Sequence, residues 1–146
     1  MYEHMLTPYD GSKEAMRGAR HGIELAAELG STVHGFYVVD LPGAPRSLSL
    51  RDDEEEMRQE YREYGEKELQ ALGEIATEHG VEFQSHIRSG KPSEEIVEFA
   101  AEEEMDVIVM GSAYRGKLGN LLGGTTDRVV RTSEVPVITE RMGVDE

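Results

Sequence analysis

The sequence predicts an α/β fold: a doubly wound, five-stranded parallel β-sheet with helices on both faces. Short runs rich in Val and Ile alternate with longer segments whose apolar residues recur near the helical period of 3.6. Strands that are separated by helices need right-handed crossovers, which make the sheet parallel. The 146 residues suit a single domain, 1–146, that is large enough to bury roughly 68–70% of its unfolded surface.

The first third of the chain is predicted to form a strand, a helix and a second strand. The first strand runs from Met5 to Tyr9, and Pro8 limits it, because proline suits the end of a strand better than its middle. A helix opens at Gly11-Ser12 and continues to about Leu29, where Gly30 provides a stop signal. Thr32 to Val39 is a β-rich run and forms the second strand.

The middle third is predicted to contain a loop, a long helix and a third strand. Leu41 to Leu50 holds two prolines and a glycine and is typical of a loop. The helix extends from Asp52 to His79, and acidic residues crowd its first turn, where they favour the helix dipole. Val81 to Ile87 is the third strand. The larger apolar and aromatic residues of the helix recur on one side: Met57, Tyr61, Tyr64, Leu72 and Ile75. The two tyrosines are expected to face the core or a dimer partner, not to form a stacking platform for a ligand.

The last third is predicted to add a helix, the fourth strand, a short helix and the fifth strand. Gly90-Lys91-Pro92 leads into a helix with proline in its first turn, where the missing N–H does no harm. Val107 to Met110 is the fourth strand, Thr125 to Thr132 a short helix, and Val135 to Thr139 the last strand. The buried face of the proline-led helix is expected to consist of Ile96, Val97, Ala100 and Ala101.

The charge balance excludes several classes of partner. The chain has 30 acidic and 15 basic residues, a net charge of −15, so most of its surface would repel nucleic acid. Such acidity indicates a solvated surface, and a sharper interpretation is a halophilic protein, because salt screens self-repulsion. No apolar run approaches the roughly 20 residues that span a bilayer, and no signal peptide is evident. With no cysteine, a cytoplasmic location without disulfides is the expectation.

Familiar catalytic and metal-binding motifs are missing from the sequence. There is no GxxxxGK[ST] motif and no GxGxxG after the first strand. The five histidines are scattered without metal-ligand spacing, which favours structural or surface roles: His4, His21, His34, His79 and His86. No residue stands out as a general base toward a γ-phosphate, apart from Asp10 acting through a water, so at most slow ATP hydrolysis is expected.

The most informative stretch is the glycine-rich loop between the fourth strand and the short helix. A loop of this kind exposes backbone N–H groups and a helix N-terminus, which favour an anion such as phosphate, and Arg115 and Lys117 add positive charge. In a doubly wound sheet, ligands bind outside the carboxyl ends of the strands, where the strand order reverses. If the fourth strand returns beside the first, Pro8-Tyr9-Asp10 lies next to Gly111 at one crevice.

Each residue at this crevice has an ordinary structural role as an alternative. Asp10 could accept hydrogen bonds from ribose hydroxyls or help to hold Mg²⁺, or it could cap the following helix. Thr125 could cap its own helix, direct its hydroxyl at an oxyanion, or do both. Arg115 and Lys117 could equally be a solvated pair.

Five motifs, in the right order over nearly the whole chain, resemble the universal stress protein family. They are Pro8-Tyr9-Asp10-Gly11-Ser12, Tyr37-Val38-Val39-Asp40, Gly90 to Ile96, Met110-Gly111 with Leu121 to Arg131, and Ser133 to Ile138. The resemblance implies a sheet of order 3-2-1-4-5, of the adenine nucleotide alpha-hydrolase-like type, and a homodimer formed through the last strand, Val135 to Thr139. In one branch of the family it also implies ATP bound at the carboxyl end of the sheet.

The phosphate motif of that branch is Gly, two residues, Gly, nine residues, Gly, then Ser or Thr. Gly111, Gly124 and Thr125 stand at the required spacing. By resemblance, Val38 would contact adenine through its backbone, and Pro8 and Asp10 would line the adenosine half. The whole implied cofactor site comprises Pro8, Asp10, Val38, Met110, Gly111, Ser112, Tyr114, Arg115, Gly116, Gly124, Thr125 and Thr126.

One residue departs from the motif, because Tyr114 occupies the position of the second glycine. A bulky residue disfavours a positive φ there and adds volume beside the phosphates. Either the loop rearranges around Gly116 and keeps phosphate contacts through Ser112, Arg115 and Gly116, or Tyr114 fills the pocket. In the second case the protein binds a smaller nucleotide or none.

Two functions remain in competition. The first is a homodimeric stress-response regulator that binds an adenine nucleotide, ATP with Mg²⁺, and acts on an unknown protein partner. The second is an interaction module of the same fold with a vestigial pocket blocked by Tyr114. A phosphoacceptor receiver domain is disfavoured, because it requires an Asp after the third strand and a Lys after the fifth, where this chain has Arg88-Ser89 and Glu140-Arg141.

Overall fold

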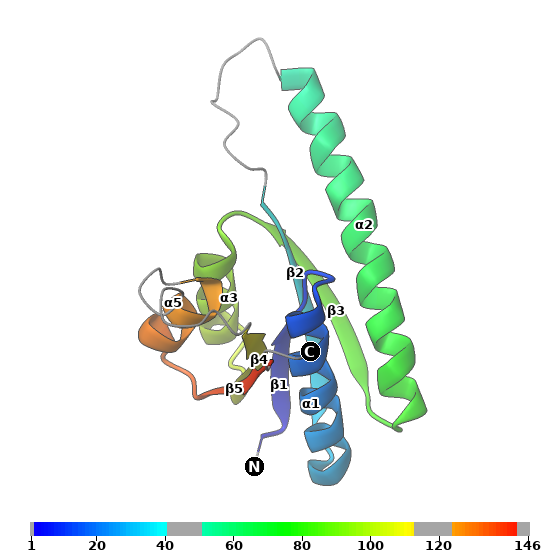
Figure 1. Ribbon diagram of the computed structural model, residues 1–146, viewed down its shortest axis with the longest axis vertical. Coiled ribbons are helices and arrows are strands. Elements are labelled where there is room, and N and C mark those ends of the chain that lie inside the picture. Colours follow the sequence, from blue (N-terminus) through cyan, green and yellow to red (C-terminus); the bar gives the residue numbers. More distant parts are fainter. Residues whose placement is uncertain (1, 41–50, 113–123, 143–146) are drawn as a thin grey trace.

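A computed structural model describes residues 2–40, 51–112 and 124–142. Its sheet has five parallel strands in the order β3-β2-β1-β4-β5, which confirms the predicted fold class and strand order (Figure 1). Among the described residues, no helix is long and apolar enough to cross a membrane. The elements are β1 (His4–Pro8), α1 (Lys13–Leu29), β2 (Thr32–Val39), α2 (Arg51–Glu78), β3 (Phe83–Ser89), α3 (Pro92–Glu102), β4 (Val107–Ser112), α5 (Thr125–Thr132) and β5 (Val137–Arg141).

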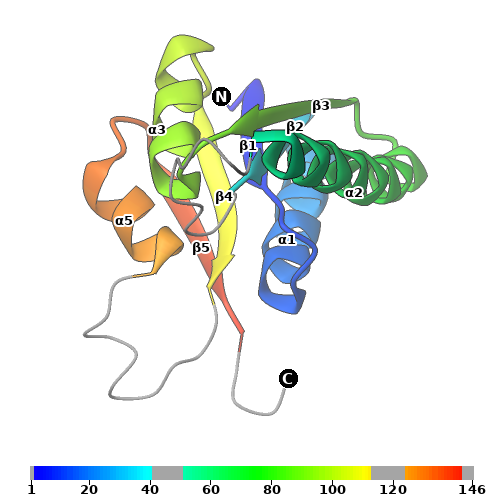
Figure 2. The ribbon, with the colours of Figure 1, turned by 90° about the horizontal axis from the view of Figure 1, so that it is seen from above.

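Helices cover both faces of the sheet, so the molecule has three layers (Figure 2). On one face α1 and α2 bury a core that includes Met5, Ile23, Leu69, Leu72 and Val109. On the other face α3 and α5 bury a smaller core, built from Leu6, Phe36, Ile96, Phe99, Ile108 and Val129. The alternation of Met5 and Leu6 between the two cores is the period-two pattern of a strand that is buried on both faces.

Several predicted boundaries shift in the structure. β4 continues through Gly111 and Ser112, because these residues pair with Glu140 and Arg141 of β5. β5 begins at Val137 and not at Val135, since the Ser133 hydroxyl holds a tight turn by accepting the Val135 N–H and donating to the Val135 carbonyl. β3 likewise runs from Phe83 to Ser89, two residues later than expected.

The predicted buried face of α3 is partly wrong. In α3 the buried residues are Ser93, Ile96, Phe99 and Ala100, whereas Ala101 is exposed, because the helix turns Phe99 toward the sheet. In α2 Leu72 is buried, but Met57 and Tyr64 are 42% and 45% exposed. The amino-terminal part of α2 extends beyond the sheet (Figure 1). The predicted loop from 41 to 50 lies outside the described residues.

A helix and the sheet approach very closely where α1 crosses β4. A Cβ atom added to Gly18 would overlap the backbone nitrogen of Gly111, and one added to Gly111 would overlap the carbonyl oxygen of Glu14. The backbones of α1 and β4 therefore touch directly, with no side chain between them. This contact places the amino-terminal turn of α1 against the carboxyl end of β4.

We predict that Gly18→Ala destabilises the protein by at least about 3 kcal/mol, at the upper end of overpacking effects, because backbone cannot yield as a side chain can. Alanine would otherwise favour the helix by about 1 kcal/mol. The matched control is Gly73→Ala in α2, where the added Cβ lies 3.0 Å from the movable Phe83 ring. Urea unfolding of both variants measures the difference. Equal stabilities for the two variants would contradict the direct backbone contact.

Candidate functional site

The carboxyl ends of β1 and β4 lie side by side, at the point where the strand order reverses. β1 pairs with β2 on one side and with β4 on the other, so successive strands leave it in opposite directions. This confirms the prediction that the fourth strand returns beside the first, which brings the segment after Pro8 toward the segment at Gly111. Crevices of this kind, outside the carboxyl ends of parallel strands, are where doubly wound sheets bind ligands.

The turn between β1 and α1 is organised by its own polar groups. The Asp10 carboxylate accepts a hydrogen bond from the Ser12 N–H at 2.9 Å, and the Ser12 hydroxyl accepts from the Ala15 N–H at 3.2 Å. Ser12 is thus the helix cap, and the prediction that Asp10 could cap the helix is wrong. Gly11 between them has a φ of 88°, the left-handed region that glycine tolerates. Asp10 itself is exposed at the crevice.

α2 supplies a support for this turn that sequence reasoning missed. The Tyr64 hydroxyl lies so close to Gly11 that a Cβ atom there would be 2.5 Å from it. The Tyr64 ring is also 6.1 Å from that of Tyr37, measured between centroids. Burial, together with the nearby Glu68 carboxylate, raises the pKa of Tyr9 to about 12, so the phenol stays neutral. Nothing in the helical spacing of Tyr64 indicated contact with a turn that lies more than 50 residues earlier in the chain.

Gly111 is enclosed by two helices on opposite faces of the sheet. α1 presses its backbone against one side, and on the other the Thr126 hydroxyl of α5 donates a hydrogen bond to the Gly111 carbonyl at 2.9 Å. The structure therefore brings Gly111 and Thr126 together, although they are 15 residues apart in sequence. The amino terminus of α5 is thereby held at the carboxyl end of β4.

The prediction that Thr125 caps its helix is wrong. Gly124 occupies the cap position of α5, without a side-chain hydrogen bond, and Thr125 is the first helical residue. The first N–H groups of a helix have no partner within it, so a helix that starts without a side-chain cap leaves donors open to water or to an anion. Of the other predicted site residues, Met110 is buried and Val38 half-buried. Tyr114, Arg115 and Gly116 lie outside the described residues.

The site thus has two chemically different sides. The β1 side offers an exposed carboxylate, which suits hydroxyl groups or a divalent cation. The β4 side offers the amino terminus of α5, which has no side-chain cap among the described residues and which suits an anion. In the described part of the chain, the crevice included, no cluster of three or more His, Asp or Glu residues could hold a metal ion.

Comparison with known proteins gives consistent matches. The model of the universal stress protein family matches residues 1–140. A universal stress protein from Methanocaldococcus jannaschii is 34% identical over 142 residues, which covers 94% of this chain and 81% of the relative. The solved structure of another protein from that organism superposes with a TM-score of 0.81 at 26% identity and covers 98% of each chain.

Two other solved structures with this fold contain adenine nucleotides. One is a universal stress protein in complex with cAMP, with a TM-score of 0.73 at 21% identity, covering 97% of this chain and 99% of that one. The other is a universal stress protein family protein from Arabidopsis thaliana with AMP bound, also at 0.73 and 21%, covering 97% and 93%. At this identity the likeness shows the fold alone, and the nucleotides are those of these two proteins.

Proposed function

Because the chain belongs to the universal stress protein family, we propose that it is a cytoplasmic stress-response protein that binds an adenine nucleotide. The nucleotide would lie at the carboxyl ends of β1, β2 and β4, and the protein would act as a homodimeric regulator of a protein partner. ATP with Mg²⁺ is the proposed ligand, because the site combines a carboxylate with backbone groups that favour phosphate.

The observation that carries this proposal is the enclosure of Gly111. Its carbonyl is tied to Thr126, and its Cα lies against the backbone of α1, so the start of α5 sits at the switch point of the sheet. Gly111, Gly124 and Thr125 also keep the spacing of a phosphate motif. The AMP and cAMP complexes of proteins with the same fold support adenine as the base.

The two sides of the crevice suggest a division of roles. Asp10 would accept hydrogen bonds from ribose hydroxyls or bind Mg²⁺ through water, since a carboxylate beside bare phosphate oxygens would repel them. Phosphate would lie at the first turn of α5, which the Thr126–Gly111 hydrogen bond holds beside the carboxyl end of β4. Val38, near the end of β2, would contact adenine through its backbone, with Pro8 lining the adenosine half.

We predict that calorimetric titration with ATP and Mg²⁺ gives a saturable signal, and that Asp10→Asn weakens it by roughly 10- to 100-fold, the value of a charged hydrogen bond. Asparagine can still accept the Ser12 N–H, so the turn is kept. Asp106→Asn, the same change at the opposite, amino-terminal end of the strands, is the matched control and should leave affinity unchanged. AMP, cAMP and ATP compared in one buffer identify the preferred nucleotide.

The competing function is an interaction module whose pocket Tyr114 blocks. Absence of heat and of any thermal shift at millimolar ATP, with the wild type folded, would reject nucleotide binding in favour of this module. Tyr114→Gly then tests why the wild type does not bind ATP. Binding that appears only in this variant would show that the tyrosine side chain blocks the pocket. Nucleotide detected after acid release from freshly purified wild-type protein would reject the module.

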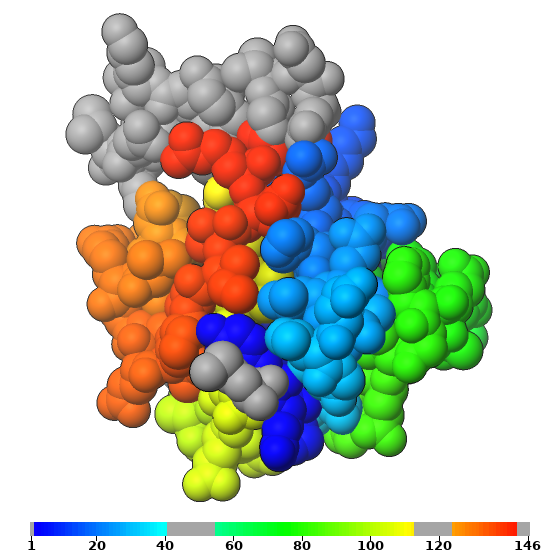
Figure 3. Space-filling view, turned by 90° about the horizontal axis from the view of Figure 1, so that it is seen from below, coloured from blue at the N-terminus to red at the C-terminus, as the bar shows by residue number. Residues whose placement is uncertain are grey.

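The proposed homodimer rests on β5. This strand forms one edge of the sheet, and it lies at the surface between α1 and α5 (Figure 3). Val137 and Ile138 are only half-buried in the isolated chain. An exposed strand edge is an aggregation hazard, which a second copy would cover.

We predict that light scattering gives the mass of a dimer at micromolar concentration, and that Thr139→Asp shifts the protein toward monomer. Thr139 is exposed on β5, so the new charge would not disturb the core. Thr77→Asp, at an exposed position of α2, is the matched control and should remain dimeric. A monomeric wild type, or equal behaviour of the two variants, would contradict dimerisation through β5.

A further inference from the structure

Three histidines from adjacent strands form a continuous hydrogen-bonded chain across the sheet. His4 Nδ1 lies 3.1 Å from His34 Nε2, and His34 Nδ1 lies 3.0 Å from His86 Nε2. The ring centroids are 5.2 Å apart at both steps. These hydrogen bonds connect β1, β2 and β3, and they start at the amino-terminal end of the sheet, because His4 begins β1.

The strand register brings the three histidines together, so their spacing in the sequence did not reveal the contacts. His4 pairs with Thr32, two residues before His34, and His86 pairs with Phe36, two residues after it. Each ring therefore stands one diagonal step from the next on the same face of the sheet. His34 is 5% exposed, His86 is half-buried, and His4 is exposed at the end of the chain.

The number of hydrogens limits how many protons the three hydrogen-bonded histidines can bind. Each of the two N···N contacts needs one hydrogen, and each outer nitrogen, Nε2 of His4 and Nδ1 of His86, can hold one more. Three neutral imidazoles carry three hydrogens, and a fourth can be added with both contacts intact. A fifth hydrogen must place two N–H groups face to face in one contact. With both contacts intact, the three histidines thus bind one extra proton and no second.

The surroundings also oppose a second proton. Burial, with His86 and His4 nearby, lowers the pKa of His34 from 6.5 to about 4, although Glu82 acts in the opposite direction. Burial likewise lowers the pKa of His86, with Glu103 opposing and Arg88 reinforcing the effect.

The neighbours of the two outer rings are also defined. The Phe99 ring of α3 lies 4.7 Å from that of His86, and the Arg88 guanidinium lies over Phe99 at 5.0 Å and pairs with Glu102. At the other end, the Asp106 carboxylate accepts the backbone N–H of His4. Glu103 and Arg88 thus act on His86 in opposite directions, with the effect of Glu103 the larger, whereas the Asp106 carboxylate is engaged with the His4 backbone.

We propose that His4, His34 and His86 form an acid-sensitive link between β1, β2 and β3, which holds while the chain carries at most one extra proton and opens when it binds a second. In the unfolded state all three imidazoles are protonated freely as the pH falls below about 6.5. The unfolded chain then binds up to two more protons than the intact link. Stability is therefore complete above this pH and declines as the pH falls toward 4.

Urea unfolding of the full chain at half-unit steps from pH 7.5 to 4.5 tests this link. As the pH falls, we expect the unfolding constant of the wild type to rise more steeply than that of His34→Phe. The extra rise is roughly 10- to 100-fold per pH unit, which corresponds to one to two more protons taken up on unfolding. The carboxylates titrate in both proteins, so the difference isolates the link. His79→Gln, which removes an exposed imidazole from the turn after α2, is the matched control and should keep the wild-type slope. Equal slopes for the wild type and His34→Phe would overturn the proposal.

A measurement on the wild type keeps the proposal testable if His34→Phe does not fold. Carbon-13 NMR of the imidazole Cε1 atoms follows each ring while the amide spectrum reports whether the fold persists. We expect the three rings to share a single proton for as long as the native amide spectrum remains. Three independent one-proton titrations within the native state would overturn the link.

Discussion

The rest of the structure depends on the direct contact between the backbones of α1 and β4. Gly18 and Gly111 have no side chains, so the helix lies on the strand at a distance that any other residue would increase. The contact fixes the start of α1, and with it the β1–α1 turn that carries Asp10. It also leaves the opposite face of Gly111 free for Thr126, whose hydrogen bond positions α5. The positions of both sides of the crevice thus depend on contacts with Gly111.

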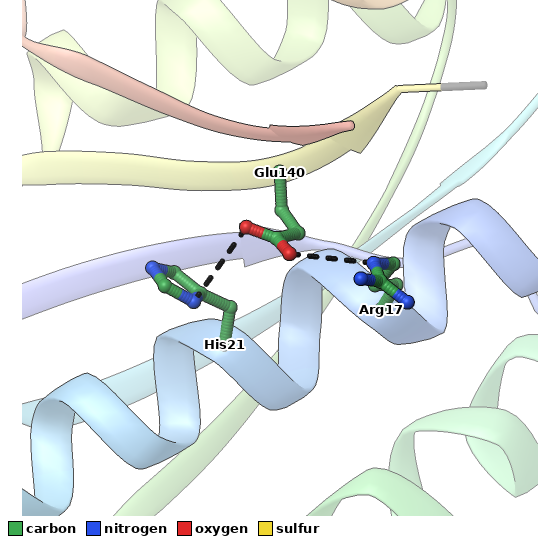
Figure 4. A network of polar contacts seen from close by, with 3 residues as sticks. All are labelled: Arg17, His21 and Glu140. Carbon is green, nitrogen blue, oxygen red and sulfur yellow. Dashed lines mark hydrogen bonds and ion pairs between the residues drawn. The ribbon is translucent and has the colours of Figure 1, made fainter. Parts of the chain in front are cut away.

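Further contacts brace this arrangement from the edge of the sheet. Glu140 of β5, which pairs with Gly111, forms an ion pair with Arg17 at 3.3 Å and lies 3.7 Å from His21 (Figure 4). Both partners are on α1, so the helix is tied to β5 across β4. Exposed pairs of this kind contribute little stability, but they join α1 to the strand proposed for dimerisation.

Much of the fold could be predicted from the sequence, because strand and helix periodicities are local properties. Thr32–Val39 and Thr125–Thr132 have the predicted bounds, and the resemblance supplied the strand order. Features that depend on register and packing could not be predicted in this way. The extension of β4 to Ser112 requires pairing with β5, the cap position of Gly124 depends on how α5 meets β4, and the histidine chain exists only in the assembled sheet.

The central claim, that an adenine nucleotide binds where β1 and β4 separate, is tested most directly by mapping backbone amide NMR shifts during titration with ATP and Mg²⁺. The account predicts saturable shifts concentrated at Asp10, Val38, Gly111 and Thr125, with little change along β3. Shifts confined to the other end of the sheet, or none at millimolar nucleotide, would contradict it.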